Sequence, residues 1–261
     1  MKIATNGIET NYTIEGDGPW VTLSHSLACN LSMWDEQAKL LARSFKVLRY
    51  DTRGHGGSSA PAGPYTLDQL AEDAKALFAA LGIERTHWIG LSMGGMIGET
   101  FALKYPDFFQ SMVLADTTSR YPAEAAGIWE DRIKTAQTKG MDAVVDGTLA
   151  RWFTEPYRKT NPPAVARVGD SIRTTPVAGF VGCCHAIPKI NLTHRLKEIP
   201  CPTLVIVGEQ DPGTPVSMAK EIVEGKPGAK LVIIPSAAHL SNIEQPEAFT
   251  KAMLEFLDTA K

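Results

Sequence analysis

Residues 86–106 read THWIGLSMGGMIGETFALKYP, which is a short apolar run, one serine among glycines, and then a helix-like segment that stops before a proline. Gly90-Leu91-Ser92-Met93-Gly94 fits the pattern G-x-S-x-G, which joins a buried strand to a helix through a sharp turn. The glycines are needed because the turn strains the backbone at Ser92 and packs the strand close against the helix. The stretch therefore predicts a serine hydroxyl that projects from the end of a strand, beside the amides of a helix N-terminus.

Further runs rich in Val, Ile and Leu recur along the chain, with helical patterns between them. With the run before Ser92, they occupy residues 20–24, 45–51, 86–91, 111–116, 203–209 and 230–235. Their apolarity is continuous rather than alternating, which indicates burial on both faces, as in a parallel sheet. Segments 1–6 and 10–15 alternate instead and predict an antiparallel hairpin at the sheet edge. The predicted fold class is α/β.

Helix boundaries are marked by capping residues. In residues 65–82, Thr66 can cap a helix, Gln69 completes a capping box, and Gly82 suits the left-handed position after its end. The helix after Ser92 is expected to end near Tyr105, before Pro106.

The strand-helix alternation stops between residues 117 and 196, where the sequence becomes helical and uneven. Because strands resume at Thr203, we predict a helical cap insertion over 117–196, set on a core formed by 1–116 and 197–261. The alternative is a stretch of ordinary core helices.

Composition excludes several classes of partner. The 261 residues are 44% hydrophobic, enough for a large core, and the net charge of −3 includes no long run of either sign. We therefore expect a small-molecule substrate, with no nucleic acid and no membrane as partner. No run of about 18 apolar residues and no leader pattern appears, so we expect a cytoplasmic protein. The sequence leaves the oligomeric state open.

The cysteines do not predict a disulfide framework or a metal site. They are few and unevenly spaced, at Cys29, Cys183, Cys184 and Cys201. The cluster Cys183-Cys184-His185 lacks a partner pair at zinc spacing, so we interpret these thiols as reduced packing residues and predict no metal or other cofactor.

A serine hydroxyl needs a histidine base, and that base needs an acid to orient it. Asp211 follows the run 203–209, and His239 comes soon after the run 230–235. Like Ser92, both lie beyond the carboxyl ends of predicted strands, the edge at which parallel sheets bind ligands. Their order, serine then acid then histidine, is one of the known orders of such triads. Ser92, Asp211 and His239 are the predicted catalytic residues.

Other candidates for these roles are placed less well. Asp116 also ends a strand and is the second choice for the acid, whereas Glu244 is expected to brace the loop of His239. The remaining histidines considered are interpreted as structural: His55, His87 and His194.

An oxyanion needs two preorganised donors. We predict that they are the backbone N–H groups of Met93 and of Leu27, the latter in the loop after residues 20–24. His25 is expected to shape this loop rather than to act as an acid or base. The alternative is a plain strand-helix connection.

Several motifs together resemble the α/β-hydrolase superfamily across essentially the whole chain. They are GLSMGG, DTRGHGGSS, GEQD and AAHLSNIEQPEAF. The narrower resemblance is to 3-oxoadipate enol-lactonases, through LSHSLACNLSMWDEQ, LRYDTRGHGGSSAPAGPYTLDQLAED, LARWFT and SNIEQPEAFTKAMLEFL. The resemblance implies a mostly parallel, eight-stranded sheet flanked by helices. At the position of His25 these lactonases carry an asparagine, and the histidine is nearer the His-Gly of general esterases.

The resemblance also implies a substrate. It would be an enol-lactone with a free carboxylate, opened with water through an acyl-enzyme in the breakdown of aromatic compounds. A cap arginine would bind the carboxylate, beside an aromatic wall. The candidates for these substrate contacts are Arg120, Trp129, Arg132, Arg151 and Trp152, although an arginine on a helix often forms only a surface ion pair.

Three other functions fit the same motifs. One is a broader carboxylesterase or aryl esterase with perhydrolase activity, and another is a carbon-carbon bond hydrolase acting on ring-cleavage products. The third is a catalytically silent binding protein that retains the serine turn.

Overall fold

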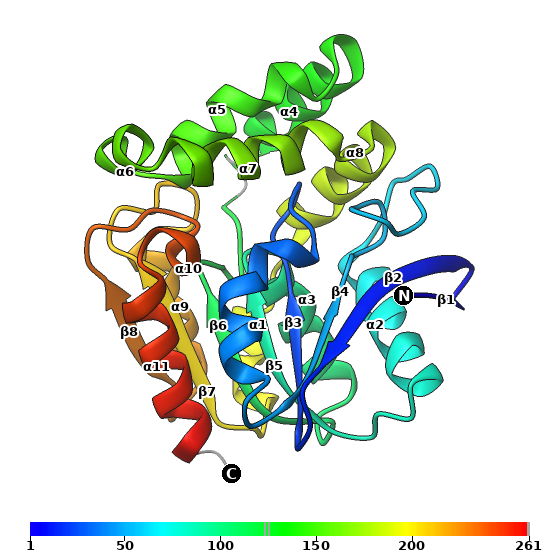
Figure 1. Ribbon diagram of the computed structural model, residues 1–261, viewed down its shortest axis with the longest axis vertical. Helices are drawn as coiled ribbons and strands as arrows, with labels where there is room; N and C mark the ends of the chain where they lie inside the picture. Colours follow the sequence, from blue (N-terminus) through cyan, green and yellow to red (C-terminus); the bar gives the residue numbers. More distant parts are fainter. Residues whose placement is uncertain (123, 125, 260–261) are drawn as a thin grey trace.

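The computed structural model describes residues 1–122, 124 and 126–259, and it contains a single eight-stranded sheet flanked by helices (Figure 1). The strand order is β1-β2-β4-β3-β5-β6-β7-β8. The strands are β1 (Lys2–Thr5), β2 (Ile8–Glu15), β3 (Trp20–Ser24), β4 (Lys46–Tyr50), β5 (Thr86–Leu91), β6 (Phe109–Ala115), β7 (Thr203–Gly208) and β8 (Lys230–Ile234). The predicted α/β class with an eight-stranded sheet is confirmed.

Strand pairing places the loops after β3 and β5 next to each other. β1, β2 and β4 pair antiparallel, and every other neighbouring pair is parallel. In the register between β3 and β5, Ser24 lies opposite Gly90. The loops after β3 and β5 therefore leave the sheet at the same edge, next to each other.

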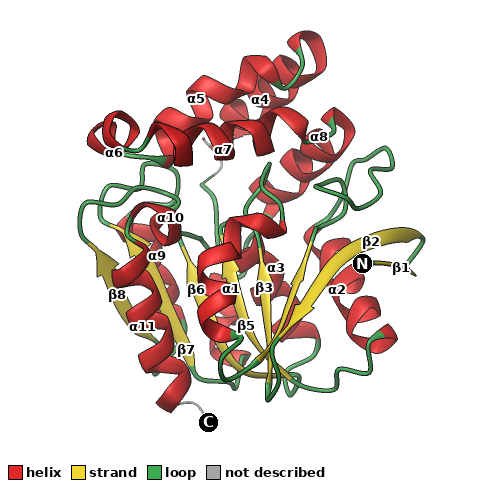
Figure 2. Cartoon of the chain, viewed as in Figure 1, coloured by secondary structure: helices red, strands yellow, loops and turns green. Residues whose placement is uncertain are grey.

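Helices cover both faces of the sheet (Figure 2). Helices α1 (Asp35–Leu41) and α11 (Pro246–Thr259) pack together on one face, while α2 (Leu67–Ala80), α3 (Met93–Lys104) and α9 (Val216–Gly225) cover the other. The short helices in the connecting loops are η1 (Leu31–Trp34), η4 (Thr193–Glu198) and α10 (Ser241–Glu244). The predicted cap of α2 is present, because the Thr66 hydroxyl accepts the Gln69 N–H at 3.0 Å and Gly82 has a φ of +68°.

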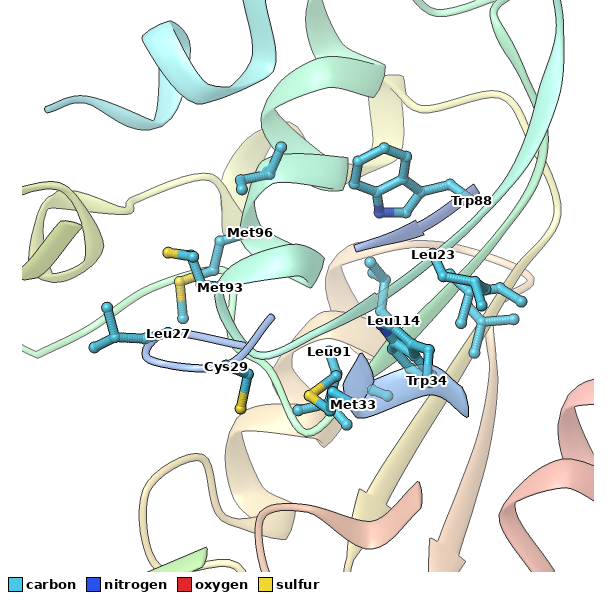
Figure 3. Close-up of a cluster of buried hydrophobic side chains, with 14 of the residues drawn as sticks. Leu23, Leu27, Cys29, Met33, Trp34, Trp88, Leu91, Met93, Met96 and Leu114 are labelled. Atoms are coloured by element: carbon cyan, nitrogen blue, oxygen red, sulfur yellow. The ribbon is translucent and has the colours of Figure 1, made fainter. Parts of the chain in front are cut away.

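The core is densely apolar on both sides of the sheet. Figure 3 shows side chains from β3, β5 and β6, namely Leu23, Leu91 and Leu114, in one cluster with Trp34 and Trp88. All five are essentially inaccessible to solvent. Burial of this kind on both faces explains why these strands have continuous rather than alternating apolar sequences.

The segment between β6 and β7 lies over the carboxyl ends of the strands (Figure 1). It contains α4 (Ala126–Lys139), α5 (Asp142–Trp152), α6 (Glu155–Thr160), α7 (Pro162–Thr174), α8 (Val177–Ala186) and η3 (Ile187–Lys189). We call α4 to α8 the cap. The domain limits 1–116, 117–196 and 197–261 stay predictions, and positions 123, 125, 260 and 261 within them lie outside the described residues.

Among the described residues, no helix is both long enough and apolar enough to cross a lipid bilayer.

Candidate active site

Ser92 occupies a strained turn between β5 and α3. Its φ and ψ are +55° and −116°, a region that side chains avoid, and its N–H donates to the Ala115 carbonyl at 2.8 Å. A Cβ on Gly90 would collide with the Gly94 carbonyl, and one on Gly94 would collide with the Ser24 carbonyl. The expected reason for glycine on both sides of the serine, the close packing of strand and helix, is therefore observed.

His239 and Asp211 form a buried hydrogen-bonded pair. Nδ1–H of His239 donates to Oδ2 of Asp211 at 2.7 Å. Oδ1 of Asp211 accepts the N–H groups of Gly213 and Thr214 at 2.8 and 3.1 Å, and the Thr214 hydroxyl donates to Oδ2 at 2.6 Å. These contacts fix the carboxylate, and with it the plane and tautomer of the imidazole.

The environment of His239 favours its protonated form. Burial lowers the pKa of the imidazole, but the charge of Asp211 and the hydrogen bond to it outweigh burial, so the pKa lies above its ordinary value. With Nδ1 bonded to Asp211, Nε2 carries the lone pair of the neutral ring.

Asp116, the second candidate for the acid, has different partners. Its carboxyl accepts the Gly208 N–H at 2.7 Å and the Ser241 hydroxyl at 2.5 Å. Burial, together with the nearby charge of Asp211, raises the pKa of Asp116 to about 8. It is therefore Asp211, and not Asp116, that bonds to His239.

Glu244 connects the loop of His239 to the cap. Its carboxylate accepts the Ala238 N–H at 2.9 Å and the Thr154 N–H at 3.0 Å. The expected bracing contact is therefore present, and it also holds the segment between α5 and α6.

Two backbone amides near Ser92 are available as donors. Met93 is the first residue of α3, so its N–H has no partner within the helix. Leu27 lies in the loop after β3, and among the described residues no acceptor bonds to its N–H. These are the two groups predicted to bind an oxyanion.

A cavity of about 310 Å³ lies between the cap and the strand ends, and both Ser92 and His239 line it. The Trp152 ring stacks on the His239 ring at a centroid distance of 6.0 Å. The rest of the wall is mainly apolar, with two arginines: Ser26, Leu27, Tyr121, Pro122, Ile128, Trp129, Arg132, Arg151, Trp152, Ile187, Pro212, Gly213, Pro215 and Met218.

Arg132 and Arg151 bring positive charge to this cavity. Within the described residues neither guanidinium forms an ion pair. The Arg132 guanidinium lies over the Trp129 ring, 4.7 Å from its centroid, and Nη2 of Arg151 donates to the Thr148 hydroxyl at 3.2 Å. Burial lowers the pKa of both side chains, and the charge of Arg132 contributes to a value of about 10 for Arg151. An anionic ligand would relieve this unfavourable burial.

Arg120 was expected as a third candidate, but the structure places it elsewhere. It is half-exposed, and Nη2 forms an ion pair with Glu221 at 3.2 Å on the surface. It does not line the cavity, so we withdraw it as a substrate contact. The chain turns away after β6, where Arg120 pairs with Asn191 in an isolated β-bridge.

With this geometry established, comparison with known proteins identifies the family. The family described as "alpha/beta hydrolase fold" matches residues 19–246. The chain belongs to the α/β-hydrolase family. The prediction of a hydrolytic enzyme is therefore confirmed.

Individual α/β-hydrolases similar to this chain include enol-lactonases. 3-Oxoadipate enol-lactonase 2 of Acinetobacter baylyi is 34% identical over 253 residues, covering 96% of this chain and 94% of its own. The crystal structure of the enol-lactonase from Burkholderia xenovorans LB400 has a TM-score of 0.95 and 39% identity, covering 99% of this chain and 100% of its own. A relative from Pseudomonas savastanoi pv. phaseolicola, 30% identical and covering 93% of this chain and 95% of its own, is named "Putative carbamate hydrolase RutD".

Several residues of this α/β-hydrolase site, which line the cavity or contact Asp211, were not predicted. Ile128 is 61% exposed yet lines the cavity mouth, one helical turn from Arg132 on α4. Because Ile128 lies four residues before Arg132, the two side chains share one helix face, and this spacing could have predicted that Ile128 lies beside the arginine. Thr214 and Met218 follow Asp211 closely, but nothing in their sequence context marked them.

The remaining histidines and cysteines lie outside this cavity. His87 is buried in β5 with Nδ1 2.8 Å from the Ser111 hydroxyl, and His194 is exposed in η4. All four cysteines are free and buried, and among the described residues no three His, Cys, Asp or Glu side chains meet in a metal-binding arrangement.

Proposed function

We propose that this α/β-hydrolase opens a lactone that carries a free carboxylate, with Ser92 as nucleophile, His239 as general base and Asp211 as its orienting acid. The observation that carries the proposal is that Ser92, His239 and two arginines line one cavity, and that neither arginine forms an ion pair within the described residues. The first two residues suit acyl transfer, and the arginines suit an anionic substrate.

Because Nδ1 of His239 is bonded to Asp211, Nε2 is the atom that acts as the base in the proposed reaction. Nε2 removes the Ser92 proton as the serine oxygen attacks the ring carbonyl, and Asp211 stabilises the imidazolium formed. The oxyanion lies between the N–H groups of Leu27 and Met93. Collapse breaks the ring C–O bond, and the imidazolium returns its proton to the leaving oxygen. Water, deprotonated by His239, then attacks the acyl-enzyme and releases the acid and Ser92.

An enol-lactone is the substrate class that best fits these groups. Its leaving oxygen becomes an enol, which tautomerises to a ketone and so removes the nucleophile that would close the ring again. The similarity to enol-lactonases supports this choice. Two arginines in a cavity of about 310 Å³ favour a small anion over a long neutral ester.

The test compares kcat/KM for 3-oxoadipate enol-lactone and for a neutral ester, 4-nitrophenyl acetate. Ser92→Ala should lower both by about 10⁴-fold or more, as expected for a triad nucleophile, without changing thermal unfolding. Arg132→Met and Arg151→Met should each lower kcat/KM for the lactone by about 10- to 100-fold, because each removes a hydrogen bond to a charged group. The kcat/KM for the ester should stay within about twofold of the parental value.

Arg120→Met is the matched control, because it removes an arginine that pairs with Glu221 outside the cavity. An equal loss of kcat/KM for the lactone in all three arginine variants would show that Arg132 and Arg151 do not bind its carboxylate. Near-parental turnover in a folded Ser92→Ala protein would reject the mechanism. A neutral ester or a carbamate preferred over the lactone would instead indicate a broader hydrolase.

A further inference from the structure

Two buried imidazoles flank the loop that contains Leu27. His25 follows β3 and His55 lies in the loop after β4, and both side chains are inaccessible to solvent. Their ring centroids are 5.3 Å apart. Neither ring lines the cavity, so neither contacts substrate.

The hydrogen bonds of His25 define its tautomer. Nε2 is 2.9 Å from the Thr52 N–H, which can only donate, so Nε2 is unprotonated. Nδ1 must then carry the proton, and it donates to the Ser26 carbonyl at 2.7 Å. That carbonyl belongs to the same peptide unit as the Leu27 N–H. Its oxygen also accepts the Cys29 N–H at 3.2 Å.

His55 holds the next peptide unit in the same way. Nε2 accepts the Ala28 N–H at 3.0 Å, and Nδ1 donates to the Arg53 carbonyl at 3.1 Å. Ala28 has a φ of +56°, which is unfavourable for a residue with a Cβ. The bond to His55 therefore stabilises a strained conformation directly after Leu27.

Burial keeps both rings in the neutral form that this arrangement requires. It lowers the pKa of His55 to about 3, with the neighbouring His25 adding to the effect, and it lowers the pKa of His25 despite the opposing charge of Asp51. For both rings, the lowered pKa favours the neutral form, in which Nε2 can accept a hydrogen bond.

We infer that His25 and His55 are positioning residues of the oxyanion hole, which hold the peptide units on either side of Leu27 so that its N–H is aimed at the developing oxyanion. The inference rests on the proposed function, since it takes the Leu27 N–H as an oxyanion donor. Donation from His25 to the Ser26 carbonyl also polarises that amide and strengthens its N–H as a donor. An oxyanion donor must be in place before charge develops, which explains why two buried side chains fix one short loop.

The test separates transition-state binding from substrate binding. His25→Leu should lower kcat for 4-nitrophenyl acetate by about 10- to 100-fold, less than the 10²- to 10³-fold expected for complete loss of an oxyanion donor, with KM within about threefold. The affinity for phenylboronic acid, whose Ser92 adduct places an oxygen in the oxyanion hole, should fall in parallel with kcat. His25→Asn should recover part of both losses, since its amide can still donate to the Ser26 carbonyl.

His87→Leu is the matched control, because it also removes a buried imidazole but lies within β5, away from this loop. It should change thermal unfolding and leave kcat and boronate affinity within about twofold. If His25→Leu does not fold, His55→Leu is measured in its place and should show the same coupled losses.

Parental kcat and boronate affinity in a folded His25→Leu or His55→Leu protein would overturn the inference. Losses no larger than those of His87→Leu would do the same. Failure of the proposed function is distinguishable, because in that case Ser92→Ala would itself retain activity.

Discussion

Glu99 is a fully buried acid on α3, and in the described part of the chain neither of its carboxyl oxygens has a hydrogen-bond partner. Burial raises the pKa of Glu99 well above the ordinary value of 4.5, so the folded protein holds the neutral acid. The unfolded chain regains the ordinary value. Unfolding therefore releases a proton at any pH between the two values, and the stability contributed by this group falls as pH rises.

Glu99→Gln should remove this pH dependence while preserving the shape of the side chain. We expect the variant and the parent to be about equally stable at pH 5. As pH rises, the free energy of unfolding of the variant should exceed that of the parent by up to about 1.4 kcal/mol more for each pH unit. This gain should stop above the pKa that Glu99 has in the folded protein. Urea unfolding at pH 5, 6.5 and 8 measures the difference.

Glu72→Gln provides a control of opposite sign. Hydrogen bonds from Lys104 and Tyr105 lower the pKa of Glu72, so its contribution is present at high pH and is lost as pH falls. Parallel pH profiles for the parent and the Glu99 variant would show that Glu99 is not held neutral.

Residue positions were predictable from sequence where the backbone alone determines them. Ser92, Asp211 and His239 each follow a strand, and the edge of a parallel sheet brings such residues together whatever the loops do. Arg120 shows the limit. Which cap arginine faces the cavity depends on the rotation of α4 and α5 and on competition from Glu221, and neither is encoded in local spacing.

The loop of His239 and the cap share one carboxylate. Glu244 accepts N–H groups from Ala238, beside His239, and from Thr154, between α5 and α6. The Leu240 N–H also donates to the Trp152 carbonyl at 3.1 Å. The cap is therefore coupled to the position of the proposed base, as well as forming the roof of the cavity.

Glu244→Ala should loosen both elements together. It leaves two backbone N–H groups without their acceptor, so the free energy of unfolding should fall by about 1–3 kcal/mol for each that is not resolvated. We also expect kcat to fall by about tenfold, because His239 loses its fixed position. Urea unfolding and kcat for 4-nitrophenyl acetate measure the two effects.

The control for Glu244→Ala is Glu221→Ala. It breaks the exposed pair with Arg120, which should cost at most about 1 kcal/mol and leave kcat unchanged. A Glu244 variant with parental stability and kcat would show that the cap and the His239 loop are not coupled through this residue.

Strand and helix identities were predictable from sequence, since continuous apolar runs and capping residues are local signals. β3 and β5 have the predicted bounds, and the ends of the other predicted strands differ from the prediction by at most two residues. How the cap helices pack on one another was not predictable. α4 pairs with α8 and α5 with α7, and such pairings depend on side chains far apart in sequence.

The charge of the cavity opposes that of the chain. The protein has a net charge of −3, yet the cavity that contains the proposed nucleophile is lined by Arg132 and Arg151, both in the cap. An anionic substrate of the proposed kind would thus be repelled weakly at long range and attracted strongly within the cavity. Salt screens exposed charges over about 8–10 Å at physiological ionic strength, and it screens buried charges much less.

Ionic strength should therefore separate the two contributions. For 3-oxoadipate enol-lactone we expect KM to change by less than about threefold between 0.02 and 0.5 M NaCl, because a half-buried guanidinium keeps most of its attraction. KM for 4-nitrophenyl acetate should be constant and controls for salt effects on the fold. Steady-state kinetics at four salt concentrations measures both. A more than tenfold rise in the KM of the lactone, with the ester unchanged, would mean that the carboxylate is bound by exposed surface charge, and Arg132→Met should then leave that salt dependence unaltered.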